Sequence, residues 1–217
     1  MKKIVLVFIT LLLLTGCTSE IDMNNYDKLI DSFLSKNTSL VNNYSSGYKY
    51  YLPTGVRVIE SKDYNEKLYY NGYNYYMFVD IVSYYYKNDI NYTESKNLYY
   101  SKKLDYNGKK GYIEISQIDN LYKISMYYNY TKIEAYVDKD NLSQSIINIC
   151  NILNSIKYND SIINLYVGSG ETALNEETYD FYKPRKEGNF INYINQFDIY
   201  EEKEKINENN IGNEGNE

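Results

Sequence analysis

The chain has 217 residues, including 30 Tyr and 2 Cys but neither His nor Trp, and a formal net charge of −6. This length suits one domain of ordinary size with a buried core, and the composition excludes collagen-like and disulfide-framework proteins. Without histidine, Ser-His-Asp and Cys-His catalysis are excluded, as are histidine-ligated zinc, haem and iron sites. An acidic chain offers nucleic acid no basic surface, so we expect no DNA or RNA partner.

The first 16 residues have the pattern of an export signal. Lys2 and Lys3 precede an apolar stretch at residues 4–14. This stretch is shorter than the roughly 20 residues that a membrane-spanning helix needs, and a basic start before such a stretch is typical of a secretory signal. The sequence therefore predicts a signal peptide at residues 1–16 that is absent from the mature chain.

The signal ends in Leu14-Thr15-Gly16-Cys17, an apolar residue followed by two small residues and a cysteine. This motif resembles the lipobox of bacterial lipoproteins. The resemblance implies that the thiol of Cys17 receives a diacylglycerol, that the chain is cleaved before Cys17, and that the new amine is often acylated. Two or three acyl chains make a lasting membrane anchor. Residues 17–25 would then be the lipid anchor and a short linker, with the protein on the extracytoplasmic face of the cell membrane.

Cleavage before Cys17 changes the charge and the cysteine content of the chain. Loss of Lys2 and Lys3 leaves 21 basic and 29 acidic residues, a net charge of −8. With Cys17 lipidated, Cys150 has no partner for an intrachain disulfide. Cys150 lies in an apolar helical pattern and no histidine can activate it, so we predict a buried, unreactive thiol.

Apolar side chains recur every three or four residues between residues 24 and 43, which predicts an amphipathic helix. They are Tyr26, Leu29, Ile30, Phe33, Leu34, Leu40 and Val41. Because the polar face of this helix is not basic, packing on a sheet is favoured over a membrane-surface position.

Residues 48–137 are rich in Tyr, Ile and Val and contain turn dipeptides at short intervals, which is typical of an antiparallel meander. Asn71-Gly72 and Asn107-Gly108 supply the positive φ angles of type I′ hairpins, and Asp119-Asn120 marks a third turn. After that turn apolar and polar residues alternate, so each strand is expected to bury one face. The predicted buried residues are Tyr122, Ile124, Met126 and Tyr128, then Ile133, Ala135 and Val137.

A second amphipathic helix follows the meander. Asp138 and Asp140 are candidate N-cap residues. The apolar stripe behind them is Leu142, Ile146, Ile149, Leu153 and Ile156. Helix, meander and helix predict an α+β domain at residues 26–166, an antiparallel sheet with both helices packed on it. This order is similar to the domain shared by PsbP and Mog1 proteins, a resemblance of fold that implies no function.

The C-terminal part carries weaker patterns. Gly168-Ser169-Gly170 predicts a flexible joint, and a short helix is expected near residues 190–197 of a C-terminal extension at residues 167–200. Residues 201–217 consist almost entirely of Glu, Asn, Lys and Gly, which predicts an acidic disordered tail.

Runs of tyrosine are the most unusual feature of the sequence, at residues 69–70, 75–76, 84–86, 99–100 and 127–128. Neighbouring side chains of a strand point to opposite faces, so one tyrosine of a pair would enter the core and the other would be displayed. Displayed phenols can stack on sugar rings or hold a peptide. The favoured interpretation is that tyrosine fills the core and the sheet surface, because it suits half-buried strands.

Acidic side chains in the sheet region could supply the two carboxylates of a glycosidase, but no spacing marks a pair. The candidates are Glu60, Asp63, Asp80, Glu94, Asp105, Glu114, Asp119 and Glu134. Residues 105–108 and 138–140 lack the remaining ligands of a calcium loop, so a hairpin turn and a helix cap are expected there. We therefore expect no catalytic residue, no metal and no cofactor.

The sequence favours a non-catalytic role in binding or assembly at the bacterial cell surface. The expected partners are the membrane, through the lipid on Cys17, and an envelope glycan, peptide or protein. Two alternatives stay open: a structural docking subunit of an envelope complex and, more distantly, a carboxylate-dependent glycoside hydrolase.

Overall fold

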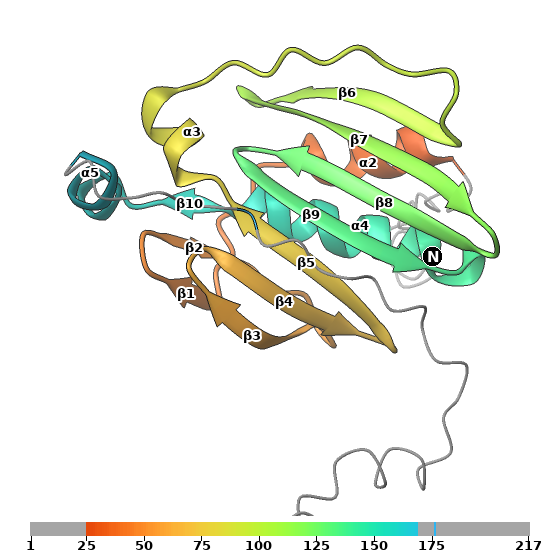
Figure 1. The fold of residues 1–217 in the computed structure, drawn as a ribbon, viewed down its shortest axis with the longest axis horizontal. Helices are drawn as coiled ribbons and strands as arrows, with labels where there is room; N and C mark the ends of the chain where they lie inside the picture. Colours follow the sequence, from red (N-terminus) through yellow and green to blue (C-terminus); the bar gives the residue numbers. More distant parts are fainter. Residues whose placement is uncertain (1–24, 169–175, 177–217) are drawn as a thin grey trace, which may run out of the picture. The chain divides into compact units, whose positions relative to one another are not determined.

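The computed structural model describes residues 25–168 and residue 176. These residues form an α+β fold with a seven-stranded antiparallel sheet, a three-stranded sheet and several helices (Figure 1). The helices are α2 (Tyr26–Leu34), α3 (Ile81–Tyr86), α4 (Lys139–Ser155) and α5 (Asp160–Gly168). The strands of the larger sheet are β3 (Arg57–Lys62), β4 (Asn65–Tyr70), β5 (Tyr73–Val79), β6 (Tyr100–Tyr106), β7 (Lys109–Ile118), β8 (Leu121–Tyr128) and β9 (Thr131–Val137). Those of the smaller sheet are β1 (Asn43–Ser45), β2 (Tyr48–Tyr50) and β10 (Lys157–Tyr158).

The larger sheet consists of two meanders rather than the one continuous meander that the sequence predicts. Its strand order is β3-β4-β5-β9-β8-β7-β6, so the last strand of the second meander pairs with the last strand of the first. Helix α3 separates the two meanders because Asp80 caps it, accepting a hydrogen bond from the Ser83 N–H at 2.8 Å. The tyrosines at residues 84–86 therefore lie on a helix and not on a strand.

The hairpin turns confirm the role of the Asn-Gly pairs. Asn71 and Gly72 have φ angles of 46° and 89°, and Asn107 and Gly108 have 53° and 76°. Two further turns have positive φ angles without glycine, at Asp63-Tyr64 and Asn129-Tyr130. The sequence does not predict these two turns, because Tyr rarely adopts a left-handed conformation.

Helix α2 is shorter than the predicted helix at residues 24–43. It begins after the N-cap Asn25 and ends at Leu34, because residues 37–39, Asn-Thr-Ser, are weak helix formers that compete for backbone hydrogen bonds. Leu40, which the prediction placed on the buried face, is 59% exposed. Helix α4 confirms its prediction: Oδ1 of the N-cap Asp138 accepts the Asn141 N–H at 2.9 Å.

The hydrophobic core lies between the larger sheet and the helices α2 and α4, which pack on the same face of the sheet (Figure 1). The predicted alternation in β8 and β9 and the predicted stripe of α4 are confirmed, since all of these side chains are buried. Cys150 is fully buried in α4, and burial raises the pKa of its thiol. The prediction of a buried thiol is therefore correct.

A buried acid joins the smaller sheet to β4. Glu66 is 2% exposed, and its two carboxylate oxygens accept hydrogen bonds from the hydroxyls of Tyr48 and Tyr50. The two rings stack at 6.1 Å between centroids. Burial raises the pKa of Glu66, and the two phenols oppose this effect. The sequence gives no signal for this cluster, because residues 18 positions apart meet only in the folded chain.

In the part of the chain that the structure describes, no helix is long and apolar enough to cross a membrane. Cys17 and the rest of residues 1–24 lie outside the described residues, as do the helix expected near residues 190–197 and the tail at residues 201–217. Of the predicted extension at residues 167–200, the structure describes Val167 and Gly168, which end α5, and Glu176.

Candidate binding surface

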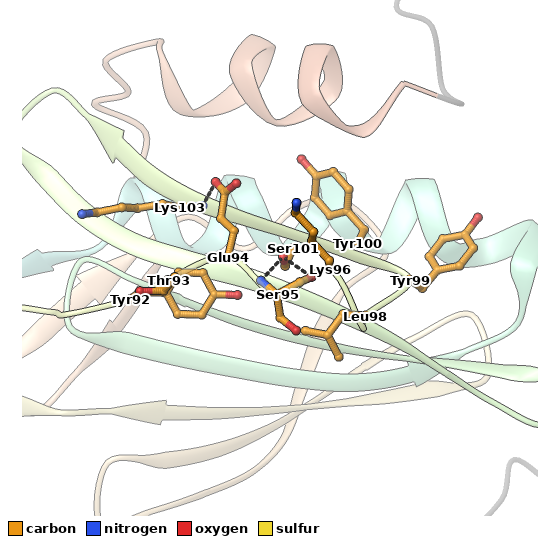
Figure 2. A pocket seen from close by; sticks show the side chains of 10 residues that line it. All are labelled: Tyr92, Thr93, Glu94, Ser95, Lys96, Leu98, Tyr99, Tyr100, Ser101 and Lys103. Atoms are coloured by element: carbon orange, nitrogen blue, oxygen red, sulfur yellow. Dashed lines mark hydrogen bonds between the residues drawn. The ribbon is translucent and has the colours of Figure 1, made fainter.

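A cavity of about 620 Å³ lies beside β6, the strand at one edge of the larger sheet (Figure 2). Its walls come from β6 and from the segment before it, residues 92–98, which we name the strap. The lining residues are Tyr92, Thr93, Glu94, Ser95, Lys96, Leu98, Tyr99, Tyr100, Ser101 and Lys103. The lining thus combines two lysines, one carboxylate, several hydroxyls and aromatic rings.

The strap contacts β6 through side chains. The Ser101 hydroxyl donates to the carbonyl of Ser95 at 3.0 Å and accepts the N–H of Ser95 at 2.8 Å (Figure 2). Oε1 of Glu94 accepts the N–H of Lys103 at 2.9 Å. Oε1 of Glu94 therefore occupies the position that a main-chain carbonyl oxygen would take if another strand paired with β6.

A stack of three tyrosines holds the first residue of the strap on the sheet. The Tyr92 ring lies 4.4 Å from the Tyr112 ring at an interplanar angle of 9°, and the Tyr112 ring lies 6.0 Å from the Tyr127 ring at 11°. The Tyr92 hydroxyl donates to Glu114 at 3.1 Å. Burial, together with Glu114, raises the pKa of Tyr92 to about 12. The phenol is therefore protonated at neutral pH, as its donation to Glu114 requires.

Replacing Tyr92 by alanine is expected to lower the free energy of unfolding by about 2 kcal/mol, because the chain loses the stacked aromatic pair and the hydrogen bond to Glu114. The amide protons of Ser95 and Lys103 should then exchange faster with solvent, because the strap loses its attachment to the sheet. Hydrogen exchange followed by NMR measures this. Tyr44→Ala, at a tyrosine that is 72% exposed on β1, is the matched control. Equal exchange in the two variants would contradict the attachment.

A lysine surrounded by tyrosines holds the other end of the strap. Nζ of Lys139 lies 4.6 Å from the ring centroid of Tyr99, 5.0 Å from that of Tyr122 and 5.7 Å from that of Tyr26. It also donates hydrogen bonds to the hydroxyls of Tyr99 and Tyr26. The hydrogen bond from Lys139 lowers the pKa of Tyr99. These cation–π contacts of Lys139 in α4 join Tyr99, the residue after the strap, to Tyr26 of α2 and Tyr122 of β8.

The face of the larger sheet opposite α2 and α4 carries tyrosines and paired charges. Glu134 lies 3.4 Å from the ammonium groups of both Lys123 and Lys132, and Lys132 contacts Glu176 at 2.5 Å. Half-buried tyrosines stand among these charges: Tyr76, Tyr112, Tyr127 and Tyr136. Because Tyr112 lies between two parallel rings, its faces are covered by tyrosine and do not offer a stacking surface to a sugar.

Two tyrosine pairs on strands, at residues 75–76 and 127–128, divide between the two faces as predicted, whereas Tyr69 and Tyr70 of β4 are both half-buried. Tyr75 and Tyr128 are fully buried, while Tyr76 and Tyr127 lie on the opposite face. The buried hydroxyls are satisfied: that of Tyr75 bonds Ser145 at 2.9 Å, and that of Tyr128 donates to the carbonyl of Tyr106 at 3.0 Å.

Three of the carboxylates that the sequence singles out have separate partners in the structure. Asp80 caps α3, Glu94 accepts the Lys103 N–H, and Glu134 pairs with two lysines. Residues 105–108 include the turn of a hairpin, and Asp138 is a helix cap, as expected. Over residues 25–168 and at residue 176, no group of three or more Cys, Asp or Glu side chains is placed to hold a metal ion.

Comparison of the chain with protein-family models, with curated proteins and with solved structures finds no match. The resemblance to PsbP and Mog1 proteins therefore stays an expectation, and no relative lends a function to the cavity.

Proposed function

We propose that the chain is a bacterial lipoprotein, anchored through lipid on Cys17 at the extracytoplasmic face of the membrane, that binds a ligand without converting it. The lipobox motif supports the anchor. The cavity beside β6 carries the binding role. Its volume of about 620 Å³ falls within the range of ligand sites, about 300–1,000 Å³. Its hydroxyls, charges and rings can fix the orientation of a ligand.

The anchor would keep this cavity close to the lipid. Residues 18–25 can span at most about 28 Å between Cys17 and the start of α2. Tyr26, the first residue of α2, lies 6.3 Å from Tyr99 between ring centroids, and Tyr99 lines the cavity. A ligand near the membrane surface, such as a segment of a neighbouring envelope protein, would therefore be within reach.

The alternative role of a docking subunit has one observation in its favour. Large exposed side chains gather on α3 and α5, which pack against each other. Tyr86 is 63% exposed, Leu165 71% and Tyr166 45%. Contacts between such side chains and a second protein are typical of association surfaces. Loss of crosslinking to a membrane partner in Leu165→Asp, but not in Glu94→Ala, would favour this alternative.

Replacement of Cys17 by serine tests the anchor. Cells that produce the variant should show no labelling of the protein by a radioactive fatty acid, and the protein should leave the membrane fraction, because serine cannot form the thioether. Cys150→Ser is the matched control and should stay labelled. Labelling of Cys17→Ser equal to that of the unaltered chain would disprove the lipoprotein assignment.

Thermal unfolding of the mature chain carrying Cys17→Ser tests the binding role. The probes are cell-wall glycan fragments and a mixture of random linear peptides. A ligand at 100 times its dissociation constant stabilises the folded state by about 2.7 kcal/mol, which raises the unfolding midpoint by several degrees. Absence of a shift with every probe would remove the support for binding and favour the docking role.

A further inference from the structure

We infer that the outer edge of β6 is a binding site for an extended acidic peptide segment, which pairs with the strand in the place that the strap takes in this structure. The inference deepens the proposed binding role and rests on it. Sheet edges bind extended peptides by adding a strand, so that main-chain hydrogen bonds give affinity and alternate side chains give specificity.

The register of β6 identifies the backbone groups on this edge. β6 pairs with β7 over seven consecutive residues, from Tyr100 to Tyr106, without a shift. In an antiparallel ladder, alternate residues direct their N–H and C=O groups away from the neighbouring strand. Lys103 is one of these, because its N–H is donated to Glu94. Ser101 and Asp105 lie two residues to either side of Lys103. Their main-chain N–H and C=O groups therefore also point away from β7, and the three residues form a row along the edge.

The other described edges are poorer templates for an added strand. In β3, at the far edge of the larger sheet, the register shifts between Val58 and Glu60. In the smaller sheet, β1 has three residues and β10 has two. Irregularity and shortness of this kind protect sheet edges from pairing. Of the edge strands within residues 25–168, β6 has the longest regular ladder.

The strap takes the position of a strand without pairing as one. Three hydrogen bonds join it to β6, and each of them uses the side chain of Ser101 or Glu94. An open pocket of about 620 Å³ lies along the strap and β6. The aromatic contacts of Tyr92 and Tyr99 hold the two ends of the strap. Its middle can therefore separate from β6 at the cost of these three bonds.

The lining of the cavity indicates the chemistry of the peptide. Lys96 and Lys103 supply two positive charges, whereas the one carboxylate among the ten lining residues, Glu94, is occupied by a backbone N–H. Leu98 and Tyr100 lie at the end away from Lys103, beside Lys96, and offer apolar surface (Figure 2). The site thus favours an acidic side chain beside Lys103 and an apolar one beside Leu98.

The first experiment selects ligands for the mature chain carrying Cys17→Ser from a phage-displayed library of random linear peptides. The selected peptide is then synthesised with a single N-methyl group at each position in turn. We expect losses of affinity of about tenfold or more at every second position and small changes between them, because only alternate N–H groups face β6. Losses without this two-residue period, or no selected peptide at all, would overturn the inference.

Two pairs of variants test the edge itself. Lys103→Pro removes the central N–H and should abolish peptide binding, whereas Lys103→Ala keeps the N–H and should lose only the preference for an acidic residue. Glu94→Ala releases the N–H of Lys103 and should bind the peptide about tenfold more tightly. Glu94→Gln keeps a side-chain oxygen that can accept the N–H of Lys103, so its peptide affinity should rise less than that of Glu94→Ala. Unchanged affinity in Lys103→Pro, with its folding verified by thermal unfolding, would also overturn the inference.

The outcomes separate this inference from the proposed function. If glycan fragments stabilise the chain and peptides do not, the binding role stands and pairing with β6 is wrong. If Cys17→Ser stays labelled, the anchor is wrong, and the N-methyl scan still decides whether β6 binds peptides. If Lys103→Pro does not fold, the N-methyl scan of the peptide still decides whether the peptide pairs with β6, because that scan uses a chain in which β6 is unaltered.

Discussion

Replacing Gly111 by alanine is expected to lower the free energy of unfolding by about 3 kcal/mol, an effect at the upper end of overpacking. Gly111 lies in β7 between Leu104 of β6 and Tyr128 of β8. A Cβ at this position would overlap the carbonyl oxygen of Tyr127 and lie 2.8 Å from Cα of Tyr128. These are backbone atoms, so no rotamer change relieves the clash. The strands β7 and β8 would have to separate and would lose ladder hydrogen bonds.

Urea denaturation of Gly111→Ala and Gly108→Ala measures this effect. Gly108 has a φ angle of 76° and open space where a Cβ would stand, so its replacement costs only the strain of a left-handed residue, about 1 kcal/mol. The difference between the two variants isolates the clash from the conformational cost. A loss in Gly111→Ala no larger than that in Gly108→Ala would show that the two strands tolerate a methyl group between them.

Gly111 also illustrates what the sequence could predict about the sheet. The alternation of apolar residues in β8 and β9 and the Asn107-Gly108 turn located strands of the second meander, and Asn71-Gly72 located a hairpin of the first, because both signals are local. Glycine within a strand marks either a break or a close backbone approach. The spacing of apolar residues alone does not distinguish these, and only the pairing of Gly111 with Tyr128 shows a close approach.

The candidate binding surface was less predictable than the fold. Glu94 was one of eight acidic candidates taken from the sheet region, and nothing in its spacing marked it as the partner of the Lys103 N–H. The position of the strap depends on Tyr92 meeting Tyr112 and on Lys139 meeting Tyr99, contacts between residues distant in the chain. Tyrosine pairs indicated displayed rings, but stacking of those rings on one another is a tertiary property.

Tyr50→Phe is expected to lower the free energy of unfolding by about 2 kcal/mol at neutral pH and by about 1 kcal/mol near pH 4. The hydroxyl of Tyr50 donates to Glu66 and accepts from Nδ2 of Asn43 at 2.8 Å. A hydrogen bond to a buried carboxylate is worth more than one to a neutral carboxyl group. Tyr50→Phe therefore lowers the free energy of unfolding more at a pH at which Glu66 is ionised.

The sign of the pH dependence follows from the environment of Glu66. Burial raises its pKa in the folded chain above the ordinary value of 4.5, although Tyr48 and Tyr50 lower it. The stabilisation that Glu66 contributes is thus complete below about pH 4.5 and is lost as the pH rises through the folded value. Removing the Tyr50 hydroxyl takes away one group that favours the ionised form. The pKa of Glu66 should rise further, and the decline in stability should continue to a higher pH and become larger in total.

Urea denaturation of Tyr50→Phe, Tyr75→Phe and the unaltered chain between about pH 4 and about pH 8 tests this expectation. Tyr75 is the matched control because it is also fully buried but bonds the neutral hydroxyl of Ser145. Its replacement should cost about 1 kcal/mol at every pH. If the two variants lose stability in parallel across this range, Glu66 does not titrate in the folded chain. The two phenols would then stabilise a carboxyl group whose protonation state is fixed in the folded chain, and the pH dependence that remains would come from ionisation of Glu66 in the unfolded chain, equal in all three proteins.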